Sequence, residues 1–585
     1  MNYLLLTLGH GSSAIYVECG DDNHVTRKIG YEQERLSGIK SDSQFPIDAI
    51  TEIFKHVSLS NMQKIGICIS HWFDDETGDF AAFKPSKYME HEHLKWLTTM
   101  FSPTFIEFTN KSFTHHDAHA CSALGFFNDS IKEEQKSKAP LHVIVADGFG
   151  TNKEVISVYT GRCDGSNELK LEDRIYGYES SLGLMYQYAT SFVGMKENQD
   201  EYKFLGYESH VDEEFESIEL DMLNDCVIDC VNCLLHFDNS SYKHRNIIDF
   251  KALKDCKRNW FNTFKSYLDL LTIYDRSEYK ARVAIAYIIQ QTVEHYVGTL
   301  ISKFGMHNVV VVGGCFYNVK LNNFILNHID GLFCAMPLAG DQGAALGMLE
   351  ANGIHIPYKT LCIGTRNFYN ANKIIANHKY SHLITFADEH FGDYSDYDCL
   401  AECIAQDIAN GEMVNIVTNR MEFGPRALLS TSTLFLPTKE NAEKNNRMNG
   451  RNEVMPFAPV CLEEELTNLF FEHEYKRVVG SLNFMICTLE YNKQYGLSYA
   501  GVMHKKPLEF AYTGRPQVVK ESSFEGKILE HVRNLSDAKC IVNTSFNVHG
   551  QPIVFNLSQI LNNFEYQCRN CEANNEKLPK MYIIA

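Results

Sequence analysis

The sequence predicts an α/β protein with more than one domain. Three apolar runs rich in β-branched residues each end in a glycine turn, at Tyr3–Gly11, His142–Gly150 and Asn308–Gly314. Such runs are typical of strands, and the first two continue into a second apolar run, as hairpins do. A chain of 585 residues is also too long for one ordinary core.

The order of these segments indicates how the first domain is built. Before the third strand, apolar residues recur at steps of three and four, which predicts an amphipathic helix: Ala286, Ile289, Val293, Val297 and Leu300. Two hairpins, a helix and a strand ending in Gly313-Gly314 favour an actin-like ATPase layout, in which two similar α/β halves hold a ligand between them.

Composition shifts indicate the domain organisation. The stretch 165–260 is acidic and helical in pattern, so we expect it to insert into or cap the first domain. The pattern breaks at Ile354–Pro357, and the segment that follows is rich in loops. We therefore predict domains over residues 1–357 and 358–585.

Charge and cysteine usage limit the classes of function. The formal net charge is −20, so long nucleic acids are disfavoured as partners unless basic residues are concentrated locally. No apolar run reaches the length of a membrane span, and the N-terminal run is read as a buried strand rather than a signal peptide. The 18 cysteines are scattered, which predicts reduced thiols in a cytoplasmic protein. We interpret Cys226, Cys230, Cys233 and the Cys568/Cys571 pair as packing residues rather than zinc ligands.

The segment 114–120, THHDAHA, contains a candidate metal site. On a helix, His115 and His119 are four residues apart and share one face, so they can offer two imidazole nitrogens to one ion. Asp147 and Asp341, each beside a glycine turn, add two carboxylates and leave coordination positions free for a nucleotide phosphate. This ligand set admits Fe, Mn, Zn or Mg.

The C-terminal part contains a candidate anion site. Several arginines recur in this part, many of them beside glycine or proline: Arg420, Arg426, Arg447, Arg451 and Arg515. Guanidinium groups suit phosphate oxygens because they donate two parallel hydrogen bonds. A solvated surface or structural ion pairs remain the alternative. The segment Asn543–Asn547 follows an apolar strand, where polar side chains can face a ligand.

Taken together, these motifs resemble the NodU/CmcH-type O-carbamoyltransferase family. The segments HHDAHA, VADGFG, GGCFYNVKLN, LAGDQGAALG, MEFGPRAL and NTSFNVHGQPIV occur in the family's order and span nearly the whole chain. The resemblance implies an actin-like ATPase N-terminal domain, similar to the tRNA threonylcarbamoyl transferase subunit, and a YrdC-like C-terminal domain that binds carbamoyl phosphate. It also implies that carbamoyl-adenylate is made from carbamoyl phosphate and ATP, and that its carbamoyl group passes to a hydroxyl.

The resemblance assigns roles to individual residues. It implies metal ligation by His115, His119, Asp147 and Asp341, and an adenosine contact by Gly313, Gly314 and Asn318. Gly148 and Gly343, in the turns beside the two aspartates, complete the expected nucleotide site. His10 is expected to act as a general base for the acceptor hydroxyl, with phosphate binding as the alternative. Lys40 and Arg515 are the other expected catalytic residues. The expected carbamoyl phosphate ligands are Arg426, Arg451, Arg515, Asn543, Ser545 and Asn547.

This sequence departs from the family pattern in its C-terminal half. Thr431 and Met455 stand where the family has arginine, and Asn449 stands where it has lysine. Each change removes a cation from the expected anion pocket, so either Arg420 and Arg447 compensate or carbamoyl phosphate binds weakly.

Three functions are therefore compared. The leading one is an ATP-dependent O-carbamoyltransferase acting on a small-molecule hydroxyl, a hydroxymethylated pyrimidine nucleotide or, less favoured by charge, DNA. The others are an actin-like ATPase or kinase, which would form ADP, and a nucleotide-binding protein with weakened catalysis. N-carbamoyl transfer to tRNA is least favoured. No membrane partner is expected, and a homodimer is left open.

Overall fold

The computed structural model describes residues 1–58, 62–69, 96–97, 99, 104–106, 113–235, 249–387, 394–451, 457–493 and 495–585. Met455, one of the departures named above, lies outside these ranges. Within them, every helix is too short or too polar to cross a membrane.

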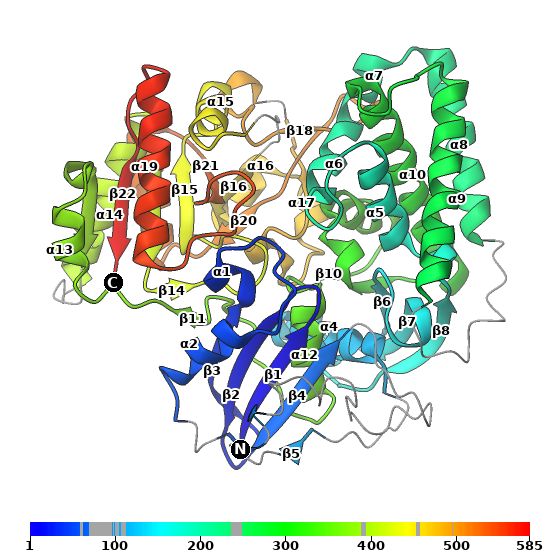
Figure 1. Cartoon of the computed structure of the whole chain (residues 1–585), viewed down its shortest axis with the longest axis horizontal. Helices are drawn as coiled ribbons and strands as arrows, with labels where there is room; N and C mark the ends of the chain where they lie inside the picture. Colours follow the sequence, from blue (N-terminus) through cyan, green and yellow to red (C-terminus); the bar gives the residue numbers. More distant parts are fainter. Residues whose placement is uncertain are drawn as a thin grey trace.

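The N-terminal domain contains two sheets of the same topology (Figure 1). The first has the order β3-β2-β1-β4-β5, from β1 (Asn2–Leu8), β2 (Ser13–Cys19), β3 (Val25–Glu32), β4 (Lys64–Ile69) and β5 (Thr104–Phe105). The second has the order β10-β9-β6-β7-β8, from β6 (Pro140–Ala146), β7 (Glu154–Arg162), β8 (Lys170–Tyr176), β9 (Asn308–Val312) and β10 (Phe333–Ala335).

The strand directions in the two sheets also agree. In each sheet the first three strands along the chain form an antiparallel meander, and the last two are parallel to the first. This repetition confirms the actin-like layout with two similar halves.

Two helices from opposite ends of the domain pack between the sheets. Helix α4 (His115–Ser130) lies on the second sheet, and α12 (Asp341–Glu350) lies on the first. The two helices also pack against each other. Their N-terminal residues are therefore brought close together although they are more than two hundred residues apart in the sequence.

Helices surround this core. Those between β8 and β9 are α5 (Leu182–Phe192), α6 (Glu201–Tyr207), α7 (Val211–Glu214), α8 (Ser217–Leu235), α9 (Phe250–Leu270) and α10 (Tyr279–Phe304), and α11 (Val319–His328) follows β9. The predicted helical insertion and the amphipathic helix before the third strand are thus confirmed. Helices α1 (Gln33–Ser37) and α2 (Ile47–Phe54) flank the first sheet.

The C-terminal domain is a second α/β unit. Its sheet has seven strands in the order β12-β22-β13-β15-β21-β16-β20. These are β12 (Ile384–Ala387), β13 (Val414–Thr418), β15 (Thr431–Phe435), β16 (Ala458–Leu462), β20 (Gln517–Val519), β21 (Ile541–Ser545) and β22 (Lys580–Ile584). The mixed α/β fold class predicted for both domains is confirmed.

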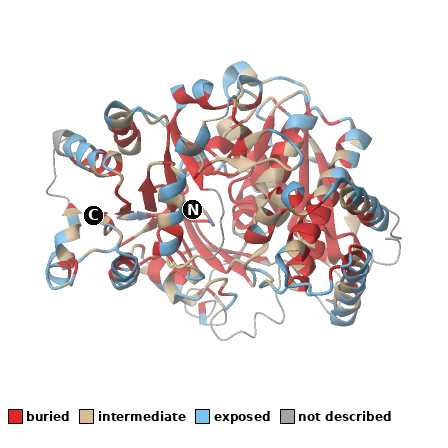
Figure 2. Ribbon diagram, turned by 90° about the horizontal axis from the view of Figure 1, so that it is seen from above, coloured by how far each residue is buried: buried red, intermediate tan, exposed pale blue. Residues whose placement is uncertain are grey.

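Helices cover both faces of this sheet. This is required because apolar side chains along β22 point alternately to one face and the other. Tyr582 and Ile584 pack toward α14 (Tyr394–Ala409) and α18 (Phe524–Ser536). Met581 and Ile583 pack toward α13 (Ala371–Ala376) and α19 (Leu557–Ala573), because successive side chains point to opposite faces. Helix α15 (Lys439–Met448) packs beside α19. Figure 2 shows buried residues along the strands of both domains and exposed ones on the outer helices.

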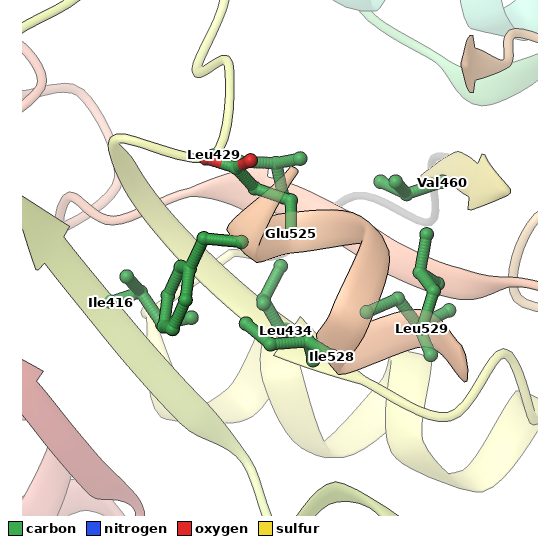
Figure 3. A pocket seen from close by; sticks show the side chains of 9 residues that line it. Ile416, Leu429, Leu434, Val460, Glu525, Ile528 and Leu529 are labelled. Carbon is green, nitrogen blue, oxygen red and sulfur yellow. The ribbon is translucent and has the colours of Figure 1, made fainter. Parts of the chain in front are cut away.

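A small apolar gap lies beneath α18 (Figure 3). Its volume is about 10 Å³, and Ile416, Leu434 and Ile528 are among the side chains that line it. This volume would hold about one water molecule, so the gap is a packing feature of the core rather than a substrate site.

The smaller strands of the C-terminal part reach the N-terminal domain. They are β11 (Gly364–Thr365), paired with β14 (Arg420–Met421), and β17 (Leu489–Glu490), β18 (His504–Lys505) and β19 (Tyr512–Gly514), which form one sheet. Short helices α16 (Leu466–Leu469) and α17 (Glu472–Tyr475) precede β17. Phe333 of β10 bridges to Val478, and the Asn322 side chain donates to the carbonyl oxygen of Ile486 at 2.7 Å. The two parts of the chain therefore share an extensive interface.

The predicted domain boundary falls in a segment that is packed against the first domain. The amide of Ile356 donates to Glu350 at 2.8 Å, and the amide of Tyr358 donates to Asp129 at 2.8 Å. The Tyr358 ring is buried against Phe126. The exact boundary at 357/358 stays a prediction.

Both carboxylates that hold this segment also face His355, which predicts a pH dependence. Hydrogen bonds from Asp129 and Glu350 raise the pKa of His355 to about 10. Because the pKa of His355 is higher in the folded than in the unfolded protein, its stabilising effect is complete at pH values below the unfolded-state pKa of about 6.5. That stability is lost as the pH rises from about 6.5 toward about 10. We expect His355→Gln to lower the urea midpoint at pH 6, with a difference from wild type that shrinks between pH 7 and 10. A difference independent of pH would contradict this role.

Four of the five cysteines interpreted as packing residues are buried, whereas Cys233 is exposed on α8, so that interpretation is wrong for Cys233. All 18 cysteines are free. Cys226 and Cys230 are buried on α8, and Cys568 and Cys571 are buried on α19. Among the described residues, no candidate metal cluster includes a cysteine.

Candidate active site

Helix α4 positions the two histidines. Thr114 caps the helix in a capping box, since its hydroxyl accepts from the amide of Asp117 and the Asp117 carboxylate accepts from the amide of Thr114. His115 and His119 are fully buried, and their Nε2 atoms are 3.1 Å apart. The middle histidine, His116, turns away and contacts Ser157 through Nδ1 at 2.8 Å. The first and last histidines thus converge, as predicted.

Two carboxylates complete the cluster. Asp147 follows β6, and Asp341 is the first residue of α12. His115 Nε2 lies 3.4 Å from Asp147 Oδ2 and 3.2 Å from Asp341 Oδ1. The corresponding distances from His119 Nε2 are 3.6 Å and 3.5 Å.

The geometry fits a shared metal ion. One ligand atom from each of the four residues lies within 4.8 Å of all the others. Ligands bound about 2.0–2.2 Å from one ion are separated by about this range of distances. The donors are two imidazole nitrogens and two carboxylate oxygens, which suit a divalent cation.

Charge organises the same cluster. Burial alone would lower the pKa of His115, but the Asp341 carboxylate and hydrogen bonds to Asp147 and Asp341 hold it well above its usual value. Burial opposes ionisation of Asp341 too, yet the two histidines lower its pKa to about 2. The pKa of Asp147 is lowered well below its usual value by the same histidines, against burial. These carboxylates are therefore ionised and available as ligands at neutral pH.

The close crossing of α4 and α12 depends on a glycine. A Cβ on Gly347 would lie 1.8 Å from the carbonyl oxygen of Ala118. Glycine is thus required for α12 to approach α4 this closely. The crossing places Asp341 beside the two histidines.

The predicted nucleotide glycines surround the two aspartates. Gly313 has φ +103°, and a Cβ there would lie 2.1 Å from the carbonyl oxygen of Ala146. A Cβ on Gly314 would be 3.0 Å from Asp147 Oδ1. Gly148 donates its amide to Asp147 at 2.8 Å, and Gly343 is in the first turn of α12. The described turns therefore bring backbone, rather than side chains, next to the cluster, which suits phosphate binding.

Asn318 has a local structural role. Its side-chain oxygen caps α11 by accepting from the amides of Lys320 and Leu321, and its Nδ2 donates to Gln290 at 2.7 Å. These contacts engage both ends of the amide. An adenosine contact from Asn318 stays a prediction.

His10 and Lys40 differ in exposure, and Lys40 is half-buried. His10 is exposed in the turn between β1 and β2. The Lys40 ammonium is 5.1 Å from the ring centre of Tyr202, a residue of α6 that is 46% exposed. Glu201 is close enough to His10 for the two to interact electrostatically. The roles of His10 and Lys40 stay predictions.

Three half-buried arginines, Arg426, Arg451 and Arg515, form a cluster that lacks neutralising carboxylates among the described residues. Burial lowers the pKa of Arg515 well below its usual value, and the neighbouring Arg426 lowers it further. Burial also lowers the pKa of Arg426 and of Arg451. Arg426 Nε is buried and has no hydrogen-bond partner in the described part of the chain. Cations with limited access to solvent are ordinarily paired, so this cluster suits an anionic ligand.

Asn543 connects three segments of the C-terminal domain: its own strand end, the turn after Arg426 and the segment after Arg515. Its Nδ2 donates to the carbonyl oxygen of Ala427 and to Gln517 Oε1, both at 2.7 Å. Ala427 follows Arg426, and Gln517 lies two residues after Arg515. Its Oδ1 is buried without a partner among the described residues. Ser545 donates to Asn547 at 2.5 Å, which shapes the turn after β21. The predicted set is thus brought together, with Arg451 donating to Thr544 at 3.3 Å.

The two proposed compensating arginines are engaged elsewhere. Arg447 pairs with Glu576 at 2.6 Å, with almost half of its side chain exposed. Arg420 is exposed and donates to the carbonyl oxygen of Cys362 at 3.1 Å. Neither of these contacts involves the arginine cluster.

Two of the departures lie in the protein core. Thr431 is buried, donates to Glu422 at 2.7 Å and accepts from Arg366 at 2.5 Å. Asn449 is buried and accepts from Gln567 at 2.9 Å. Each of the two side chains is hydrogen-bonded to neighbouring core residues, so Thr431 and Asn449 are part of the packing of this domain.

Residues that the sequence did not single out connect the two clusters. Tyr317 accepts from the amide of Gly340 at 3.0 Å and interacts electrostatically with both Arg426 and Asp341. Arg35 pairs with Glu32 at 3.1 Å and donates to the carbonyl oxygen of Gly424 at 2.6 Å. The ion pair is buried, so it fixes the turn before Arg426 against the N-terminal domain. Arg35 carried no signal in the sequence, and Tyr317 carried none beyond its place in GGCFYNVKLN.

Comparison with known proteins identifies the family. Residues 105–351 match the family model for the carbamoyltransferase N-terminus, and residues 405–573 match that for the carbamoyltransferase C-terminus. The chain belongs to the carbamoyltransferase family. These two matches include the four metal-cluster residues and the C-terminal arginines of this carbamoyltransferase.

Its relatives include nodulation proteins. Nodulation protein NolO of Bradyrhizobium diazoefficiens is 29% identical over 44% of this chain and 47% of its own. An uncharacterized protein of Methanocaldococcus jannaschii is also 29% identical, over 66% of this chain and 69% of its own. Among solved structures, HypF of T. kodakarensis aligns with 60% of this carbamoyltransferase and 47% of its own chain at 14% identity, with a TM-score of 0.28.

Proposed function

We propose that this carbamoyltransferase makes carbamoyl-adenylate from carbamoyl phosphate and ATP and transfers the carbamoyl group to a hydroxyl. The main support is that a buried His₂Asp₂ cluster and a half-buried arginine cluster lie on one chain of contacts, which runs from Gln342 beside Asp341 through Glu32 to Gly424, two residues before Arg426. One cluster suits a metal with a nucleotide phosphate, and the other suits carbamoyl phosphate.

The proposed reaction has three balanced steps. Water releases phosphate from carbamoyl phosphate and leaves carbamate. A carbamate oxygen then attacks the α-phosphorus of ATP, and pyrophosphate leaves. Finally the acceptor oxygen attacks the carbamoyl carbon, AMP leaves, and the acceptor proton passes to a base, for which His10 is the candidate.

The residues of this chain have distinct parts in that sequence. Arg426, Arg451 and Arg515 would hold the phosphate of the donor, since their charges have no carboxylate partner among the described residues. His115, His119, Asp147 and Asp341 would hold a divalent metal. When bound, that ion would neutralise phosphate charge and polarise the carbamoyl carbonyl.

The acceptor side suits an anionic planar molecule. Tyr202 follows Glu201, which interacts with His10, and has the Lys40 ammonium 5.1 Å from its ring centre. The Lys203 ammonium, 5.8 Å from the same ring, is already paired with Asp200 at 2.7 Å. An aromatic ring with an adjacent ammonium group can contact a base and a phosphate together. This favours a hydroxymethylated pyrimidine nucleotide among the hydroxyl acceptors, and the net charge of −20 favours the free nucleotide over DNA.

Product analysis tests the proposal. Purified protein is incubated with ATP, carbamoyl phosphate, a divalent metal and acceptors that include hydroxymethyl-pyrimidine nucleotides, the same bases in DNA, and aminoglycosides. We expect AMP and pyrophosphate only when carbamoyl phosphate is present, and one acceptor that gains a carbamoyl mass. ADP without carbamoyl transfer would support the kinase alternative, and nucleotide binding without turnover would support the weakened-enzyme alternative.

Replacing Arg515 tests the donor pocket. A charge-assisted hydrogen bond is worth about 1.5–3 kcal/mol, so Arg515→Ala should raise the carbamoyl phosphate concentration needed for half-maximal rate roughly 10- to 150-fold. Arg447→Ala is the matched control, because Arg447 pairs with Glu576 at the surface. An unchanged requirement in Arg515→Ala would argue against this pocket.

A further inference from the structure

A buried polar network surrounds the first turn of α4 on the side away from the metal cluster. At its centre is Arg174 of β8, whose side chain is 8% exposed. Its guanidinium lies 2.7 Å from Asp117 Oδ1 and 3.1 Å from Glu154 Oε2. It also donates to Ser157 Oγ at 3.0 Å and to the Tyr159 hydroxyl at 2.5 Å. One cation therefore contacts four side chains, two of which are carboxylates.

These partners hold the backbone of α4. The first amides of a helix have no partner within it. Here the amide of His115 donates to Thr151 Oγ1 at 3.1 Å, and the amide of His116 donates to Glu154 Oε1 at 2.9 Å. The amide of Asp117 donates to Thr114, and the Asp117 carboxylate closes the capping box. The first turn is therefore held by Glu154 and Asp117, the two carboxylates that contact Arg174.

The same network fixes the histidine that does not face the cluster. Arg174 Nε donates to Ser157 Oγ at 3.0 Å, and the same hydroxyl is hydrogen-bonded to His116 Nδ1 at 2.8 Å. Tyr159 accepts from Arg174 and donates to Asp117 Oδ1 at 2.6 Å. With His116 held on this side, His115 and His119 are directed toward Asp147 and Asp341.

We infer that Arg174 is a positioning residue for the metal histidines. By neutralising Glu154 and Asp117, it allows two buried carboxylates to hold the start of α4, and so sets the separation of His115 and His119 from the two aspartates. Without this cation the two carboxylates would be buried together with like charge, and the first turn of α4 would shift to relieve the repulsion. The inference rests on the metal role proposed above.

Lysine cannot replace Arg174 in this role. A guanidinium has five donors in a fixed planar fork, whereas an ammonium is a point charge with three donors. The four partners of Arg174 lie around the fork, so Arg174→Lys retains the charge but loses part of the geometry. This variant therefore separates positioning from simple charge balance.

Metal affinity is the readout that distinguishes positioning from general stability. Co²⁺ is titrated into the apo-protein and followed by visible absorbance, with thermal unfolding measured on the same samples. We expect Arg174→Lys to weaken Co²⁺ binding at least tenfold and to change the shape of the absorption band. Arg366→Lys is the control, because Arg366 is a buried arginine that donates to backbone carbonyls of the C-terminal domain. It should lower stability with Co²⁺ affinity unchanged.

A second variant decides the matter if Arg174→Lys does not fold. Tyr159→Phe removes only the hydroxyl between Arg174 and Asp117, and should weaken Co²⁺ binding a few-fold. Affinity within twofold of wild type in the folded variants would overturn the positioning role alone. Wild-type protein that binds no Co²⁺ would overturn the proposed metal site and this inference with it.

Discussion

Replacing His119 by alanine should abolish carbamoyl transfer. The His119 imidazole contributes one of two nitrogens that converge with two carboxylates, and its Nε2 is 3.1 Å from that of His115. Losing one electrostatic contact to a reacting group costs roughly 10²–10³-fold in rate, and the loss of a metal should cost at least as much. We expect no bound metal by elemental analysis and no carbamoylated product by mass spectrometry.

His142→Asn is the matched control. His142 is a buried histidine of β6 with an unpartnered Nδ1 among the described residues, so its loss tests the cost of removing a buried imidazole elsewhere. This variant should keep metal and activity. Asp341→Asn should behave like His119→Ala, since it removes a charged ligand with little change in volume. Full activity of His119→Ala with normal metal content would show that the cluster is not the metal site.

Introducing a side chain at Gly347 should disrupt both the fold and the metal site. The Cβ of alanine would lie 1.8 Å from the carbonyl oxygen of Ala118, and that atom is backbone that cannot rotate away. Overpacking of a core costs about 1–3 kcal/mol and occasionally more. Helices α4 and α12 would have to separate, which would move Asp341 away from His115 and His119. We expect Gly347→Ala to lower the free energy of unfolding by at least about 3 kcal/mol and to weaken metal binding, as measured by urea unfolding and metal titration.

Gly298→Ala provides the comparison for this effect. Gly298 lies in α10, where an added Cβ would meet only the edge of the Phe324 ring at 3.3 Å. Alanine also has a higher helix propensity than glycine by about 1 kcal/mol, so this variant should be neutral or slightly more stable. If Gly347→Ala and Gly298→Ala had equal stability, the close helix crossing would not be required.

The interface between the domains explains how the two clusters reach one another. Glu32 and Arg35 of the N-terminal domain are buried against Gly424, and Gly424 donates its amide to Glu32 at 3.1 Å. Gln342, next to Asp341, donates to the other oxygen of Glu32 at 3.1 Å. This chain of contacts runs from the metal cluster to the turn that carries Arg426. A movement of one domain relative to the other would therefore change the positions of residues at both clusters.

Several features could be predicted from the sequence because they are local. A spacing of four residues places His115 and His119 on one helix face. The capping box can be recognised because an acidic residue, Asp117, follows Thr114 by three positions. Strands ending in glycine marked the start of both hairpins and of the turn at Gly313. The repeated order of hairpin, helix and strand was enough to predict the actin-like layout.

Other expectations failed because they treated sequence proximity as spatial proximity. Arg420 and Arg447 lie near Arg426 and Arg451 in the chain, but they contact Cys362 and Glu576 at the surface. Thr431 and Asn449 are buried and paired with other core residues, and weak binding of carbamoyl phosphate, the other alternative, stays a prediction. Helix and strand faces, which differ from one residue to the next, decide which of two neighbours lines a site.

The sequence by itself determined the family, the fold class and the identity of the residues that converge in the candidate metal site. Only the tertiary structure decided how they are held. Arg174 lies 57 residues from Asp117 in the chain, and Asn543 lies 116 residues from the carbonyl that it holds at Ala427. Such contacts carry no periodic signal, because they depend on how separate strands and helices are packed. The geometry of this site is therefore set by tertiary packing, which brings into contact side chains and backbone groups that are far apart in the sequence.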